Sequence, residues 1–196
     1  MVRQKIIILL LVAFISTSFI SLFNESKDIK ILELKQKSRE KYYIDEIYKL
    51  ERRVNELEKN VIEYVRFRED LALSESGGNI DIVNRIGARY KYQFMPKTME
   101  KLGGNPYERI PEKHQDMIFN DWALLIVERL SDEIDMYEGT YIFDTIPVTK
   151  AGIIATAHLG GIYGTKKFLN SCGEYNPDDG HTKLSDYMYK FKDYDF

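Results

Sequence analysis

The sequence predicts a mainly α protein, in which a globular helical domain with a small irregular or hairpin segment follows an apolar N-terminal segment and a long helix. Three observations predict this. Residues 6–23 carry no charge, residues 24–70 contain no Gly or Pro, and residues 111–191 hold shorter apolar stripes separated by glycines. We therefore expect an N-terminal segment at 1–23, a helical stalk or packing helix at 24–60, and a globular domain at 61–196.

The N-terminal segment has the features of a signal for export. Arg3 and Lys5 precede the eighteen uncharged residues 6–23. That length is at the lower limit for spanning a bilayer and is long for the apolar part of a cleaved signal peptide. No Ala-x-Ala cleavage site and no lipoprotein cysteine follows, which favours a signal anchor over a cleaved peptide. In either case we expect the positive end to stay in the cytoplasm and the rest to reach the periplasmic or extracellular side of the cell envelope.

The long helix carries an apolar seam. Its members recur at alternating spacings of four and three, as in a heptad repeat: Tyr43, Ile47, Leu50, Val54, Leu57, Val61 and Tyr64. One interpretation is a stalk that forms a homodimer through 43–64. The other is a helix that packs on its own globular domain, since three heptads are short for an isolated coiled coil.

The overall composition excludes several classes of function. The net charge of the 196-residue chain is only −3, which gives no bias toward nucleic acid. The single cysteine, Cys172, rules out an intramolecular disulfide and a site built on a cysteine pair. His114 and His181 have no partner at a metal-ligand spacing, so we expect neither a metal nor a cofactor.

The globular domain is expected to consist of helices joined by loops. The first helix stops at Gly77-Gly78, because glycines tolerate the left-handed backbone that ends helices. An irregular hairpin or loop follows at 79–94. A helix opens at Pro111, another is capped by Thr149 and closed at Gly160-Gly161, and a further one is capped by Thr165. A last helix covers 185–191.

The residues best suited to catalysis or ligand binding lie in two segments, LSESGG at 73–78 and YQFMPKT at 92–98. Glu75 sits in the last turn of a helix, beside two glycines that let backbone approach a ligand. Apolar neighbours would desolvate such a carboxyl and keep it protonated near neutral pH, as a glycosidase acid requires. Gln93 offers an amide for sugar hydroxyl or acetamido groups. Tyr90, Tyr92 and Phe94 offer flat faces for sugar rings.

These segments resemble the soluble lytic transglycosylases, which share their fold with goose-type lysozyme. In that family the catalytic Glu ends a helix and is followed by a Gly-Leu-Met-Gln-Ile-Met-Pro-x-Thr stretch, with the Gln eighteen residues after the Glu. Gln93 follows Glu75 by eighteen residues, and the stretch matches again at Met95, Pro96 and Thr98. The third signature, Ala-Tyr-Asn-Ala-Gly, corresponds to AHLGG at 157–161. The three blocks keep the family's order across residues 61–172.

The resemblance implies an α+β lysozyme-like domain and assigns further residues to the site. Glu75 would be the catalytic acid, and Gln93, Tyr92 and Met95 would bind the glycan. His158 stands where the family has the tyrosine beside the acid, and Asn84 stands where it often has a polar residue facing the substrate. Tyr90 replaces the family's glycine, which we expect to narrow or reshape the groove.

The family's reaction is the non-hydrolytic cleavage of peptidoglycan glycan strands, a lyase reaction. By resemblance, Glu75 protonates the oxygen that links N-acetylmuramic acid to N-acetylglucosamine, and then accepts the proton of the C6 hydroxyl as a 1,6-anhydro ring closes. A hydrolytic muramidase is the alternative, with Asp81 as the nearest second carboxylate. A wall-binding or assembly protein without turnover, and a structural membrane protein acting through the 43–64 helix, are further alternatives.

Overall fold

The computed structural model describes residues 2–178 and 180–196, without the side chains of residues 2–13, 19, 20 and 23. The chain divides into two compact units, Met1–Glu56 and Leu57–Phe196. The first unit consists of the N-terminal part of helix α1, Val2–Ser76, whose last turns belong to the second unit. A helix thus covers all of 24–76, as the absence of Gly and Pro predicts.

The predicted signal or membrane segment at 1–23 lies largely outside the residues with described side chains. Within the part of the chain that the structure describes, no helix is both long enough and apolar enough to cross a membrane.

The second unit is mainly helical. After the end of α1 come α2 (Pro96–Lys101), α3 (Glu112–Arg129), α4 (Ser131–Tyr137), α5 (Lys150–Asn170) and α6 (Leu184–Lys190). Strands β1 (Tyr141–Ile142) and β2 (Ile146–Pro147) form a short antiparallel hairpin between α4 and α5. The predicted mainly α class is confirmed, but the hairpin lies at 141–147, whereas 79–94 forms turns with isolated bridges.

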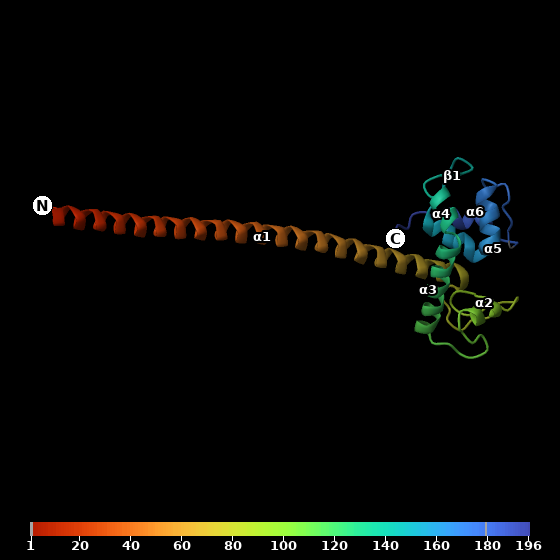
Figure 1. Ribbon diagram of the computed structural model, residues 1–196. Coiled ribbons are helices and arrows are strands. Elements are labelled where there is room, and N and C mark those ends of the chain that lie inside the picture. The colour runs from red at the N-terminus through yellow and green to blue at the C-terminus, as the bar shows by residue number, and fades with distance from the viewer. Residues whose placement is uncertain (1, 179) are drawn as a thin grey trace. The chain divides into compact units, whose positions relative to one another are not determined.

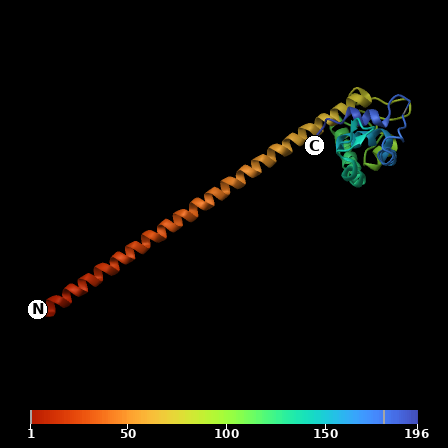
Figure 2. The same ribbon diagram turned by 90° about the horizontal axis from the view of Figure 1, so that it is seen from above.

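Helix α5 is the centre of this unit. It packs against α3, α4 and α6, and these four helices cluster in both views (Figures 1 and 2). Residues 151–157 of α5 are all buried, as expected for a helix surrounded by others. Thr149 caps it, accepting a hydrogen bond of 3.1 Å from the N–H of Gly152.

Two glycines allow α6 to approach α5 closely. A Cβ at Gly152 would lie 2.5 Å from the sulfur of Met188, and one at Gly160 would lie 2.8 Å from a methyl group of Leu184. A Cβ at Gly152 would also lie 3.2 Å from the carbonyl oxygen of Met188 and would force the helices apart, whereas one at Gly160 would displace the side chain of Leu184. Gly160, which belongs to the third sequence block, therefore has a packing role that positions α6 beside the end of α1.

The predicted helix boundary at Gly160-Gly161 is confirmed as a break within α5. The backbone leaves the helical conformation at Gly161, where φ is 65° and ψ is 174°, and a second helical stretch follows to Asn170. Thr165 lies inside the resumed helix and donates from its hydroxyl to the carbonyl of Gly161 at 2.9 Å instead of capping a new helix. Glycine adopts this conformation without a side-chain clash, so the two helical stretches meet at a kink.

The core is rich in aromatic rings. Phe67 of α1 is fully buried and lies with its ring centroid 5.5 Å from Phe191, 5.6 Å from Tyr194 and 5.3 Å from Phe196. The C-terminal residues thus fasten the last turns of α1 to the end of α6. This packing fixes the helix end that carries Glu75.

Candidate active site

Glu75 lies in the last turn of α1, next to the predicted glycine bend. Gly77 and Gly78 both adopt positive φ, at 66° and 76°, so the helix ends where the sequence predicts. The turn is fastened to the second sequence block, because the hydroxyl of Ser76 donates to the carbonyl of Lys91 at 2.7 Å. The helix end and the loop that carries Gln93 are thereby held together.

The carboxyl of Glu75 is contacted from two other helices. The hydroxyl of Tyr187 on α6 donates a hydrogen bond to Oε1. Nε2 of His158 on α5 lies 3.6 Å from the same oxygen. The side chain of Glu75 is 16% exposed, so the carboxyl sits at the edge of the core and still reaches solvent.

His158 is enclosed by aromatic rings. Its side chain is 6% exposed, and its ring centroid lies 5.1 Å from those of Phe94 and Trp122. Burial lowers the pKa of His158 below its ordinary value, although the charge of Glu75 and the main chain of Tyr92 act in the opposite direction. The imidazole is therefore neutral at neutral pH. Its Nδ1 is buried and has no hydrogen-bond partner among the described residues.

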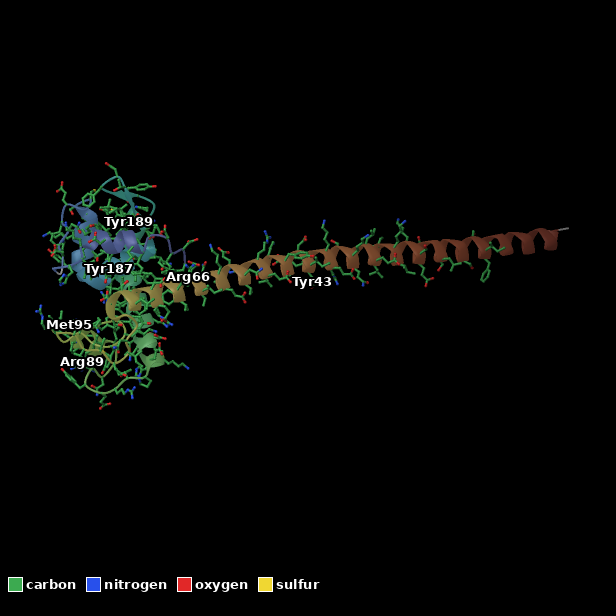
Figure 3. All side chains as sticks on the ribbon, turned by 180° about the vertical axis from the view of Figure 1, so that it is seen from behind. Tyr43, Arg66, Arg89, Met95, Tyr187 and Tyr189 are labelled. Atoms are coloured by element: carbon green, nitrogen blue, oxygen red, sulfur yellow. The ribbon has the colours of Figure 1, made fainter. Side chains whose placement is uncertain are left out.

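The structure brings members of all three sequence blocks together. His158 of the third block lies beside Glu75 of the first, at the position that the resemblance gives to the family's tyrosine. The main chain of Tyr92 in the second block acts to raise the pKa of His158. The side chain of Gln93 is half-buried and donates to the carbonyl of Tyr90 at 2.8 Å. Met95 is exposed just before α2, in the part of the unit where Figure 3 also shows Arg89.

The predicted stacking faces are corrected by the structure. Tyr90, Tyr92 and Phe94 are all buried, so none of them offers an open face to a sugar ring. The hydroxyl of Tyr92 donates to Asp116 at 2.6 Å, and its ring stacks on that of Phe119. These rings form part of the core beneath the loop, because burying large aromatic side chains stabilises the fold.

Tyr90 does not narrow a groove, since its hydroxyl points inward and donates to the carbonyls of Pro106 and Glu108. Its φ is 66°, a left-handed conformation that favours glycine. The backbone geometry thus suits a glycine, whereas this chain accommodates a tyrosine. The hydrogen bonds and the buried ring offset the strain.

Asn84 and Asp81 lie in the exposed loop after the glycines. Oδ1 of Asn84 accepts hydrogen bonds from the N–H groups of Ile86 and Ala88, at 3.0 and 2.9 Å, so this oxygen shapes its own loop. Asp81 is exposed and forms an ion pair with Arg109 at 3.2 Å. Asp81, the second carboxylate considered for a hydrolytic reaction, therefore has an ion-pair partner at the surface.

Tyr187 is a site residue that the sequence did not reveal. It lies 112 positions from Glu75 and occupies an apolar position of the last helix, where it is indistinguishable from a core residue. Figure 3 shows it on α6 together with Tyr189, which is 57% exposed. Only the close packing of α6 on α5 would have indicated which tyrosine turns inward.

A buried lysine supports the loop from below. Lys91 has a side chain that is 3% exposed, and its ammonium forms ion pairs with Glu69, Glu112 and Asp116 at 2.7, 2.9 and 3.2 Å. These pairs raise the pKa of Lys91 although burial opposes them. The network connects α1, the loop and α3, and so holds the second block beside the end of α1.

An open hollow of about 390 Å³ lies beside the residue that precedes Glu75. It is lined by Asp70, Leu73, Ser74, Lys190, Phe191 and Tyr194. Its lining includes an acidic side chain, Asp70, and a basic one, Lys190, whose ammonium donates to the hydroxyl of Ser74 at 2.5 Å.

In the described parts of the chain, no group of three His, Cys, Asp or Glu side chains could hold a metal ion.

The arrangement is suited to proton transfer by one carboxyl group. Glu75 can give and take a proton at an edge that solvent reaches, while a phenol and a neutral imidazole hold its position. Among the described residues, the partners of Glu75 include no second carboxylate.

Comparisons of the chain with protein-family models, with curated proteins and with solved structures found no match. What the site can do therefore follows from its own geometry and chemistry.

Proposed function

We propose that this protein is a peptidoglycan lytic transglycosylase, which cleaves the β-1,4 bond between N-acetylmuramic acid and N-acetylglucosamine and leaves a 1,6-anhydro product. One observation carries the proposal. A carboxyl in the last turn of a helix, 16% exposed, is held by Tyr187 and faces a buried His158 between aromatic rings. Such a carboxyl is held in place by a hydrogen-bond donor and lies at an edge that solvent reaches, where it can exchange a proton with a bound substrate.

In the proposed reaction, Glu75 acts twice. Its carboxyl proton passes to the glycosidic oxygen as the bond from that oxygen to C1 of the muramyl residue breaks. The acetamido oxygen of the same residue stabilises the positive charge at C1. The Glu75 carboxylate then accepts the proton of the C6 hydroxyl of the muramyl residue while the C6 oxygen bonds to C1. This step closes the anhydro ring and restores the protonated Glu75.

The surroundings of Glu75 favour this route over hydrolysis. Glycosidases that use water ordinarily need a second carboxylate as base or nucleophile. The described partners of Glu75 are a tyrosine and a histidine, and Asp81 is engaged by Arg109 at the surface. Substrate assistance by the acetamido group removes the need for a second carboxylate.

The wider setting of the proposal comes from the sequence. A lysozyme-like fold for the second unit would place Gln93 and Met95 along the glycan. Export through the N-terminal segment would bring the domain to the cell envelope, where its substrate lies. The reaction requires no metal or cofactor.

The proposal is tested by incubating purified peptidoglycan sacculi with the full chain and with Glu75→Gln, and measuring the initial rate of soluble muropeptide release. Loss of a general acid lowers rates by roughly 10²- to 10⁴-fold, so the variant should fall to near background. Glu100→Gln, an exposed glutamate of α2, is the matched control and should keep the wild-type rate. Equal background release by wild type and Glu75→Gln would instead indicate a wall-binding protein.

A further inference from the structure

An exposed apolar stripe runs along the middle of α1. The seam, defined here as Tyr43, Ile47, Leu50, Val54, Leu57 and Val61, has side chains that are between 52% and 62% exposed. Tyr64, the next position in the repeat, is used within the second unit. Its hydroxyl donates to Asn120 at 2.9 Å and its ring lies against Phe196. The seam therefore ends at Val61.

The residue types along the seam specify a kind of partner. The spacing places Ile47, Val54 and Val61 at one core position of the heptad, called a, and Leu50 and Leu57 at the other, called d. β-Branched residues at a with leucine at d favour a parallel coiled coil of two helices over one of three or four. The reason is that side chains at a and d pack at different angles into the gaps between side chains of the partner helix. The seam thus matches a second copy of itself.

Charges beside the seam favour the same orientation. Arg53 at position g of one strand would face Glu58 at position e of the other in a parallel pair, and this contact would occur twice. Glu46 would face Glu51 in the same way, but its charge is already countered by Lys49 at 2.8 Å on its own helix. Antiparallel strands would bring the acidic edges with Glu51 and Glu58 against each other.

We propose that the protein forms a parallel, in-register, two-stranded coiled coil through the seam, with a second copy of the chain as partner. Burying these apolar side chains between two copies supplies the free energy of association. Parallel pairing directs both N-terminal segments the same way, as two chains that leave one membrane surface would require. The proposal is independent of the chemistry at Glu75.

The first experiment is cross-linking of the full chain in detergent, in a Cys172→Ser background. Leu50→Cys places a thiol at a d position, where in-register parallel strands bring the two copies of a residue together. Arg52→Cys places one on the outer face of the same turn. Mild oxidation should convert most of the Leu50→Cys chain to a covalent dimer and little of the Arg52→Cys chain. No dimer, or equal yields from both, would overturn the proposal.

Orientation is tested by exchanging charges. Arg53→Glu and Glu58→Arg should each weaken the dimer about fivefold in sedimentation equilibrium, since like charges then face each other twice. The double variant should restore wild-type association, because it recreates both pairs with reversed sign. Single variants that associate as well as wild type, a double variant no tighter than the singles, or a wild-type monomer or trimer, would each contradict a parallel two-stranded pair. Helix content from circular dichroism should stay unchanged in all variants, since these side chains are exposed.

Discussion

Tyr187→Phe separates the role of Tyr187 at the site from its role in packing. The substitution removes the hydroxyl that donates to Oε1 of Glu75 and keeps the ring, which packs against Phe191 at a centroid distance of 5.7 Å. The residue is 7% exposed, so phenylalanine fills the same space without exposing new apolar surface. The carboxyl of Glu75 loses a donor and the position that this donor fixes.

The size of the effect follows from the exposure of Glu75. In the proposed reaction Glu75 becomes a carboxylate as it gives its proton to the glycosidic oxygen. A hydrogen bond to a charged group contributes about 1.5–3 kcal/mol. Because Glu75 is 16% exposed, water replaces part of the lost interaction, and the lower end of that range applies. About 1.5 kcal/mol in the transition state corresponds to roughly a tenfold lower rate of muropeptide release.

The assay compares initial rates of release from sacculi for wild type, Tyr187→Phe and Tyr189→Phe. Tyr189 lies on the same helix and is 57% exposed, so its variant controls for a general effect of losing a phenol from α6. We expect a tenfold loss for the first variant and none for the second. A Tyr187→Phe chain that keeps the full rate, or a Tyr189→Phe chain that loses as much, would refute the role assigned to this hydrogen bond.

Three further predictions concern stability. Phe67→Ala should lower the free energy of unfolding by about 3–5 kcal/mol in urea titrations, because it removes a fully buried ring; a loss below 1 kcal/mol would contradict the packing described. Lys91→Met should cost about 1–3 kcal/mol, because it leaves Glu112 without its cation and removes one of the two cations that Glu69 and Asp116 share with Arg68, whereas the exposed Lys101→Met should be near neutral. Burial lowers the pKa of His158 below its ordinary 6.5, so the unfolded chain binds more protons and stability falls as the pH drops below about 6.5. His158→Gln should flatten this fall in unfolding curves measured from pH 7 to pH 5.

Local signals in the sequence predict much of the fold. The glycine pair at 77 and 78 ends α1 at Ser76, and Thr149 caps α5, because each of these features acts through its own backbone neighbours. The glycine pair at 160 and 161 likewise marks the kink at Gly161, whereas Thr165 lies inside the following helical stretch and does not cap it.

Contacts between distant segments account for the rest. The order of the sequence blocks led to His158, which lies 3.6 Å from Glu75. It did not lead to Tyr187, whose position depends on how closely Gly152 and Gly160 let α6 approach α5. Nor could alternation show that Tyr90 and Tyr92 face the core, because a segment of turns has no regular inner and outer face.

The proposed reaction is most directly tested by the mass of the glycan ends that the full chain releases from sacculi. We expect muropeptides that end in 1,6-anhydro-muramyl residues, each lighter by one water than a reducing end, and we expect their loss in Glu75→Gln. Release of reducing ends alone would contradict the proposed chemistry, and unchanged release by Glu75→Gln would contradict the role of the carboxyl itself.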